Sequence, residues 1–233
     1  MEFSMTPSHV VERESELSPV QATPVVFVVD DDVSVREALE AMIHFAGLRA
    51  ETYTCAQDFL KRPRDRAPSC LVLDVMLPDL SGLDLQNLIA AERSDTPIIF
   101  ITAFGDVPMT VQAMKAGAVE FFTKPFDDQV LLDAIRHAIE CSRVALNEEA
   151  ELQSIKDRHA SLSGREREVM ALVVTGLLNK QVGAEIGIAE ITVKMHRRQV
   201  MRKMNAHSLA ELISLARRLH PDRAPKAALQ KVA

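Results

Sequence analysis

Residues 70–74, Cys-Leu-Val-Leu-Asp, form a short apolar run that ends on a single carboxylate, Asp74. A continuous apolar run that contains Val is typical of a strand buried on both faces, as in parallel sheets covered by helices. Open α/β sheets place their chemistry at the carboxyl ends of such strands. The Pro and Gly in residues 75–82 predict a tight loop over this end. The chain is therefore expected to build a site around Asp74.

A second apolar run, residues 25–29, also ends on acids, Asp30 to Asp32, and helix-spaced apolar residues follow it. Strand-like and helix-like segments then alternate as far as residue 141. The expected strands are 25–29, 48–53, 70–74, 97–102 and 119–123, and the expected helices are 33–45, 56–60, 83–92, 108–116 and 127–141. This alternation predicts an α/β fold, with a five-stranded parallel sheet, right-handed crossovers and helices on both faces.

In such a sheet the strand ends gather at one edge, which would bring together Asp30, Asp31, Asp74, Thr102 and Lys124. Carboxylates about 4 Å apart repel by roughly 4 kcal/mol per pair at an effective dielectric constant of about 20, so the cluster needs a cation. Mg²⁺ fits, because it prefers oxygen and is usually held by one or two carboxylates plus phosphate oxygens. A phosphoryl group on Asp74 would then be bound by the Thr102 hydroxyl and the Lys124 ammonium.

Four motifs in this half resemble receiver domains of two-component response regulators. They are Val29-Asp30-Asp31-Asp32, Asp74-x-x-x-Pro78-x-x-x-Gly82, Ile101-Thr102 and Thr123-Lys124-Pro125-Phe126. The resemblance covers residues 25–143 and implies a doubly wound, flavodoxin-like sheet in the order 2-1-3-4-5.

The same resemblance implies the roles of the site residues. Asp74 would be phosphorylated from a phosphohistidine of a partner sensor histidine kinase. Mg²⁺ would be held by Asp31, Asp74 and the Met76 carbonyl, with Asp30 acting through water. Phe121 would rotate together with Thr102 as a switch, and the bond from Lys124 to Pro125 would be a cis peptide.

The charge of the chain divides between its two halves. Residues 1–150 carry 12 Lys and Arg against 25 Asp and Glu, whereas residues 151–233 carry 15 against 8. The basic half is therefore the candidate for a polyanionic partner. The polar residues 144–158 between them are interpreted as a linker, helical in part.

The basic half contains a helix-turn-helix pattern. Ser163 and Glu166 form a capping box that opens one helix. Helices over residues 179–186 and 191–204 follow, joined by a Gly-containing turn, and residues 208–219 form a last amphipathic helix. On the helix over 191–204, Val193, Val200 and Met204 share an inner stripe, while another face is basic. Such a face suits the major groove of DNA.

Three further stretches resemble the LuxR-type DNA-binding domain over residues 159–219. They are Arg165-Glu166-Arg167-Glu168-Val169, Gly176-Leu177-Leu178-Asn179-Lys180 and Thr192-Val193-Lys194-Met195-His196-Arg197. Together with the receiver motifs, these stretches make the chain similar to the NarL/FixJ class. Residues 105–109 resemble the FixJ members of that class. The resemblance implies that Lys194, Met195 and Arg198 face base edges, that Thr192, Lys180 and Arg202 hold phosphates, and that Arg197 belongs to the same DNA-binding set.

Three residues depart from the LuxR-type pattern. Leu178 and Ala189 replace hydroxyl residues at helix starts, and each lost cap would cost about 1 kcal/mol of stability. Gly183 replaces an alanine.

The predicted function is that of a cytoplasmic transcription factor, not a turnover enzyme, which dimerises on phosphorylation. Its predicted partners are a sensor histidine kinase, double-stranded promoter DNA, a second copy of the chain and, further, RNA polymerase. No apolar stretch approaches the roughly 20 residues of a membrane helix. Residues 1–24 are interpreted as a disordered leader and 220–233 as a flexible tail.

Two alternatives keep part of this prediction. A Mg²⁺-dependent phosphohydrolase could use the same acid cluster, although nothing beyond the cluster indicates a substrate pocket. A receiver could instead carry a C-terminal module that binds protein, which the salt dependence of DNA affinity would distinguish. A kinase is disfavoured, because the chain has no Gly-rich phosphate-binding motif.

Overall fold

The computed structural model describes residues 22–64, 66–93 and 95–220. The expected leader up to residue 21 and the expected tail beyond residue 220 lie outside the described residues. The chain divides into two compact units between residues 147 and 148.

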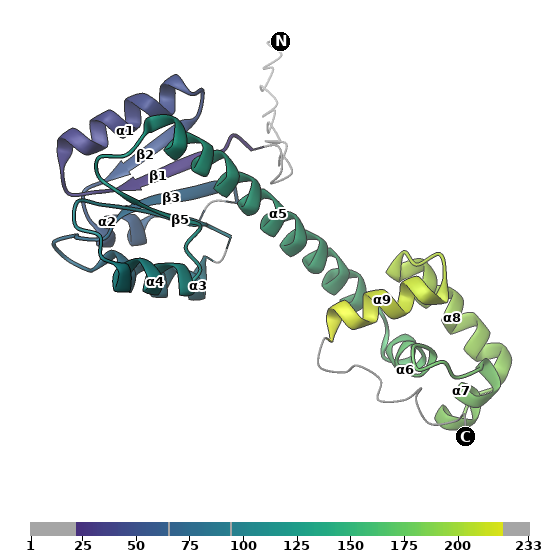
Figure 1. Ribbon diagram of the computed structural model, residues 1–233. Coiled ribbons are helices and arrows are strands. Elements are labelled where there is room, and N and C mark those ends of the chain that lie inside the picture. Colours follow the sequence, from purple (N-terminus) through teal and green to yellow (C-terminus); the bar gives the residue numbers. More distant parts are fainter. Residues whose placement is uncertain (1–21, 65, 94, 221–233) are drawn as a thin grey trace, which may run out of the picture. The chain divides into compact units, whose positions relative to one another are not determined.

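The first unit is a parallel sheet with helices on both faces, as the alternation of segments predicts (Figure 1). Its strands run in the order β2-β1-β3-β4-β5, which confirms the predicted topology. The strands are β1 Val25–Val29, β2 Arg49–Tyr53, β3 Ser69–Asp74, β4 Ile98–Thr102 and β5 Glu120–Thr123. The helices that follow them are α1 Val33–Phe45, α2 Ala56–Lys61, α3 Gly82–Glu92, α4 Val107–Lys115 and α5 Asp128–Ala160.

The two faces of the sheet belong to two separate apolar clusters, because successive side chains of a strand point to opposite sides. Val26, Val28 and Val72 pack with α1 and α5 on one face. Phe27 and Leu73 pack with α2, α3 and α4 on the other. The buried apolar runs of the sequence are therefore central strands covered on both sides.

Helix α5 is longer than the sequence pattern predicts. The expected helix over residues 127–141 continues to Ala160, so that the interpreted linker 144–158 lies inside it. Residues 142–160 contain no Gly or Pro and many strong helix formers, which explains the continuation. Ser142 is fully buried; its hydroxyl donates to the Asp95 carbonyl at 2.6 Å and accepts from the Ser69 amide at 3.0 Å. These bonds fasten α5 to the start of β3.

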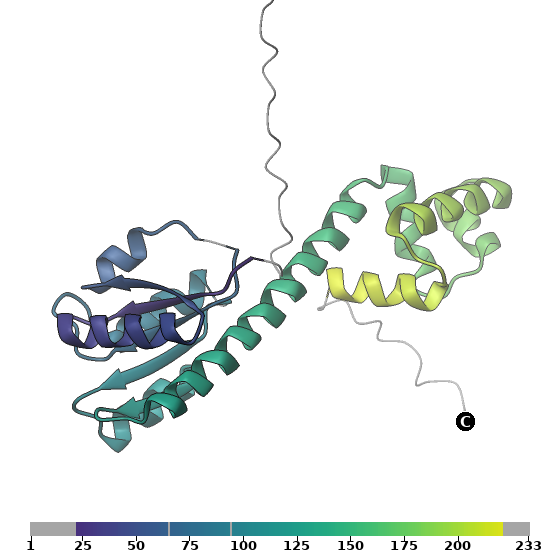
Figure 2. The ribbon, with the colours of Figure 1, turned by 90° about the horizontal axis from the view of Figure 1, so that it is seen from above.

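The second unit consists of the end of α5 and four further helices, which Figure 2 shows in green and yellow. They are α6 Gly164–Val173, α7 Asn179–Ile186, α8 Glu190–Met204 and α9 Leu209–Leu219. The predicted capping box opens α6: the Ser163 amide donates to Glu166 Oε2 at 2.7 Å, and the Glu166 amide donates to Ser163 Oγ at 3.3 Å. The core of the unit contains Ile155 of α5 and the predicted inner stripe of α8.

The departures from the LuxR-type pattern have visible local consequences. Leu178 and Ala189 begin α7 and α8 without a side-chain cap, although Gln181 Oε1 accepts from the Leu178 amide at 2.8 Å. A Cβ atom at Gly183 would lie only 2.6 Å from the Ile188 carbonyl oxygen, so the close turn into α8 depends on glycine here. In the described part of the chain, no helix is long and apolar enough to cross a membrane.

Candidate functional site

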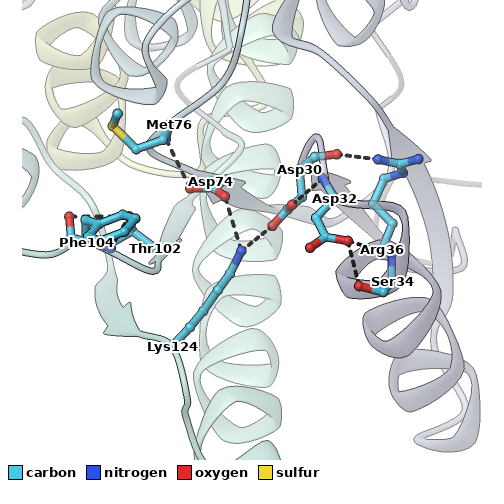
Figure 3. Close-up of polar contacts among 9 residues, drawn as sticks. All are labelled: Asp30, Asp32, Ser34, Arg36, Asp74, Met76, Thr102, Phe104 and Lys124. Atoms are coloured by element: carbon cyan, nitrogen blue, oxygen red, sulfur yellow. Dashed lines mark hydrogen bonds and ion pairs between the residues drawn. The ribbon is translucent and has the colours of Figure 1, made fainter.

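Four strand ends meet at the acidic edge of the sheet, as the predicted topology requires (Figure 3). Asp30 follows β1, Asp74 ends β3, Thr102 ends β4 and Lys124 follows β5. Asp30 and Thr102 are fully buried and Asp74 is 7% exposed, whereas Asp31 is exposed. The edge therefore holds two desolvated carboxylates and one that faces solvent.

Lys124 lies between the two buried carboxylates. Its Nζ is 2.6 Å from Asp30 Oδ2 and 3.1 Å from Asp74 Oδ2. Burial lowers the pKa of Lys124, but the hydrogen bonds and charges of Asp30 and Asp74 more than offset this and raise it above its ordinary value. The ammonium stays charged and neutralises part of the acidic cluster.

Asp30 accepts two hydrogen bonds in addition to the one from Lys124. Its Oδ1 accepts from the Asp32 amide at 2.9 Å, and its backbone carbonyl accepts from Arg36 Nη1 at 2.7 Å. Burial raises the pKa of Asp30, as does the charge of Asp74, although the bonds to Lys124 and Asp32 oppose the rise. The bond from Arg36 could not be predicted from the sequence, because nothing about a single arginine on the first turns of α1 indicates a bond to a strand end.

The residues at this edge fit a divalent cation that prefers oxygen. One carboxylate oxygen each of Asp30, Asp31 and Asp74 lie within 4.8 Å of one another. Three hard anionic donors suit Mg²⁺, which needs few protein ligands. The Met76 amide donates to Asp74 Oδ1 at 3.0 Å, which keeps the other carboxylate oxygen toward Lys124. Coordination by the Met76 carbonyl stays a prediction.

Asp32, the third acid of the run, caps a helix. Its Oδ1 accepts from the Ser34 amide at 2.8 Å and from Ser34 Oγ at 2.6 Å. The Ser34 hydroxyl and amide lower the pKa of Asp32. Its place at the N-cap of α1 fixes where the chain turns from β1 into α1, and thereby where Asp30 and Asp31 lie.

Thr102 and Phe121 lie on neighbouring strands. The Phe104 amide donates to Thr102 Oγ1 at 3.3 Å, so the hydroxyl is engaged with its own loop. Phe121 is half-buried, with its ring centroid 6.0 Å from that of Phe100. A Cβ atom at Gly105 would lie 2.7 Å from Thr123 Cγ2 and 3.1 Å from Phe121 Cε1. Gly105 therefore permits this packing, a role that sequence reasoning missed.

The peptide bond from Lys124 to Pro125 is cis, as the resemblance implies. The Lys124 amide donates to the Thr102 carbonyl at 2.7 Å. This hydrogen bond places the start of the Lys124 side chain beside the end of β4.

A basic face covers the outer side of α8 in the second unit. Val193, Val200 and Met204 are buried beneath it. Five of the predicted DNA contacts line one open surface pocket together with Ile191 and Gln199: Thr192, Lys194, Met195, Arg198 and Arg202. Met195 is 54% exposed and lies in the same lining as the basic residues Lys194, Arg198 and Arg202. The structure thus brings these five residues together on one helix.

Three basic residues of α8 have partners within the unit, and one of them, Lys194, also lines this face. Arg197 is half-buried and its Nη1 donates to Asn179 Oδ1 of α7 at 3.1 Å. Lys203 Nζ lies 2.6 Å from Glu166 Oε2, and the Lys194 ammonium lies 2.9 Å from Glu190 Oε1. Arg197 therefore braces α8 against α7, whereas Lys180 of α7 is exposed.

Comparisons with known proteins agree with this geometry. Residues 26–136 match the response regulator receiver domain, and residues 160–216 match the bacterial regulatory proteins of the luxR family. Nodulation protein W of Bradyrhizobium diazoefficiens is 50% identical over 195 residues, which cover 84% of this chain and 86% of that protein. The transcriptional regulatory protein FixJ of the same organism is 42% identical over 193 residues, covering 83% of this chain and 94% of that protein.

A solved structure is similar over both units. The response regulator StyR is 48% identical, with a TM-score of 0.75, and the match covers 84% of this chain and 98% of StyR.

Proposed function

Because the chain belongs to the two-component response regulators of the NarL/FixJ class, we propose that phosphorylation of Asp74 controls its binding to DNA. Members of this class join a receiver domain to a LuxR-type DNA-binding domain and regulate transcription. The phosphoryl group comes from a phosphohistidine of a sensor histidine kinase. A carboxylate oxygen of Asp74 attacks the phosphorus, and the kinase histidine leaves.

The observation that carries this proposal is the contact of Lys124 Nζ with both Asp30 and Asp74. An ammonium poised at 3.1 Å from the acceptor carboxylate can follow the charge of an incoming phosphoryl group. Asp30, Asp31, Asp74 and the Met76 carbonyl would hold Mg²⁺, which supplies neutralisation of the phosphoryl oxygens when bound. The chain consumes only its own acyl phosphate and is not a turnover enzyme.

The switch that follows runs through Thr102 and Phe121. The Thr102 hydroxyl leaves its bond with the Phe104 amide and donates to a phosphoryl oxygen on Asp74. The Phe121 ring, which already lies beside Gly105, then turns together with Thr102 toward the phosphoryl group. The surface of α4, β5 and the start of α5 becomes a dimer face on this proposal.

The second unit binds promoter DNA with α8 in the major groove. Lys194, Met195 and Arg198 face base edges, and Lys180, Thr192 and Arg202 hold phosphates. A dimer would read two half-sites about 34 to 36 Å apart or a multiple of this distance. RNA polymerase is a further partner at such promoters, and the cytoplasm is where this regulator meets its DNA.

The test is intact-protein mass after incubation with Mg²⁺ and acetyl phosphate, for wild type and Asp74→Asn. We expect one added phosphoryl group on the wild type alone, and tighter DNA binding by that form. Asp74→Asn treated with the same donor would refute the proposal if it bound DNA as tightly as the phosphorylated wild type.

A further inference from the structure

A second cavity lies in the LuxR-type unit, away from the basic face of α8. Its volume is about 410 Å³, and its described lining comes from the last turn of α5, from α6 and from α9, with the residues that follow α6 and α9. Cavities of roughly 300–1,000 Å³ are the usual size of small-molecule sites.

The lining of this cavity has two chemical parts. Met170, Val174, Ile213 and Leu219 form an apolar wall. Four side chains that are basic or can become so stand around it: His159, Arg167, Arg217 and His220. The residues that the structure describes in this lining include no Asp or Glu.

The basic side chains act on one another. The rings of His159 and His220 meet edge to face with their centroids 6.1 Å apart. Burial lowers the pKa of His159, and the charges of His220 and Arg167 lower it further. A bound anion would offset the repulsion between these positive charges and raise the pKa of each ring, because it would favour the charged form.

From this lining we infer that the cavity binds an organic monocarboxylate with an apolar body, its carboxylate among Arg167, Arg217 and the two histidines and its body against α6 and α9. Apolar burial would supply affinity, and the cations would select the anion. Because the site joins α6 to α9, the bound molecule would stabilise α9 in place.

Charge argues against two other occupants. Residues 221–233 follow directly on His220, but they carry Arg223, Lys226 and Lys231 against a single acid, Asp222. A second copy related by a twofold axis through the cavity would bring the same four side chains against themselves. Either occupant, the segment 221–233 or a second copy, would bring further positive charge to the basic lining. A carboxylate would bring the opposite charge.

Octanoate is a suitable probe, and octanol is its uncharged match. We expect titration calorimetry on the full-length chain to give one site for octanoate and affinity for octanol weaker by about tenfold or more. The double variant Arg167→Gln/Arg217→Gln should lose octanoate affinity by about the same factor. Arg165→Gln is the control, because Arg165 is an exposed arginine of the same helix that pairs with Glu168 and does not line the cavity.

Ala171→Phe gives a second test that leaves the charges in place. Ala171 is exposed and lines the cavity, so a larger side chain should fill the space and abolish binding without unfolding the unit. Equal affinity for octanoate and octanol, no binding of octanoate to folded wild type, or unchanged affinity in the double variant would each overturn the inference. So would a gain of about tenfold or more on deletion of residues 221–233, because the tail would then be the occupant.

Discussion

Gly82 lies directly against the backbone carbonyl of Asp74, so closely that a Cβ atom at this position would overlap the carbonyl oxygen. Gly82 opens α3, and its amide donates to the Val75 carbonyl at 2.9 Å. The loop over the acidic edge can therefore close only with glycine at this position. The backbone of Asp74 and the first residue of α3 are thus packed directly against each other.

Gly82→Ala should move the Asp74 carbonyl and lower both stability and acceptor activity. We expect a loss of about 1 to 3 kcal/mol in the free energy of unfolding, as for other overpacked sites. Urea unfolding measures the first effect, and the rate of mass gain with acetyl phosphate measures the second. Gly164→Ala is the control, because open space surrounds Gly164. If Gly82→Ala matched wild type in both, the close approach would be unimportant.

Lys124→Gln should leave Asp30 and Asp74 facing each other without their shared ammonium. We expect the metal-free protein to lose about 1 to 3 kcal/mol of stability, because a buried acceptor loses its charged donor. Saturating Mg²⁺ should then raise the Tm of Lys124→Gln more than that of wild type, since the cation replaces the missing charge. Scanning calorimetry with and without Mg²⁺ measures this, with Lys115→Gln at the exposed end of α4 as control. If Mg²⁺ raised the Tm of Lys124→Gln by no more than it raised the Tm of Lys115→Gln or wild type, the prediction would be wrong.

Glu166 should make the second unit sensitive to acid. The hydrogen bond from Lys203 and the Ser163 amide hold the pKa of Glu166 below its ordinary value of 4.5. Because the folded state has the lower pKa, the stabilisation is complete above about pH 4.5 and is lost as the pH falls through the folded value.

Glu166→Gln should therefore destabilise the unit by about 1 to 2 kcal/mol at neutral pH and little at low pH. Amide hydrogen exchange of α6 in the full-length chain, measured at several pH values, follows this unit separately. Glu168→Gln serves as control, because Glu168 is exposed and pairs only with Arg165 among the contacts described for it. A constant difference between Glu166→Gln and wild type at all pH values would rule out the linkage.

Arg197 and Arg198 are neighbours on α8 that the sequence assigns to the same DNA-binding set, but the structure gives them different contacts. Arg198 is exposed on the basic face, whereas Arg197 donates to Asn179. Arg198→Ala should weaken DNA binding with little change in stability. Arg197→Ala should instead cost about 1 kcal/mol of stability, from a lost hydrogen bond.

Fluorescence anisotropy with duplex DNA at several salt concentrations measures the DNA affinity of the two variants, Arg197→Ala and Arg198→Ala. If Arg198 also reaches a phosphate, its removal makes the salt slope shallower by about 0.9, the value for one phosphate contact. Identical losses of DNA affinity and stability in the two variants would show that the bond to Asn179 does not distinguish them.

The sequence was sufficient for the architecture of the first unit and for the location of the acidic edge. Apolar runs at 25–29 and 70–74 are local signals, and the carboxyl ends of parallel strands always meet at one edge. The capping box at Ser163 and the inner stripe of α8 are likewise local, since each depends on spacings of three to eleven residues. The pattern was wrong for the end of α5, where polar composition hid a run of helix formers.

The tertiary structure alone decided the contacts between residues far apart in the chain. Lys124 meets Asp30 across 94 positions, Ser142 joins Ser69 across 73, and Arg197 meets Asn179 across 18. The close approach of Gly82 to the Asp74 carbonyl spans only eight positions, but it too is decided by packing, because it depends on where α3 begins relative to the end of β3. Helical and strand periodicity report on which face of an element is buried, and they carry no information on which distant side chain will lie opposite. That choice is made when the packed elements bring the two residues together.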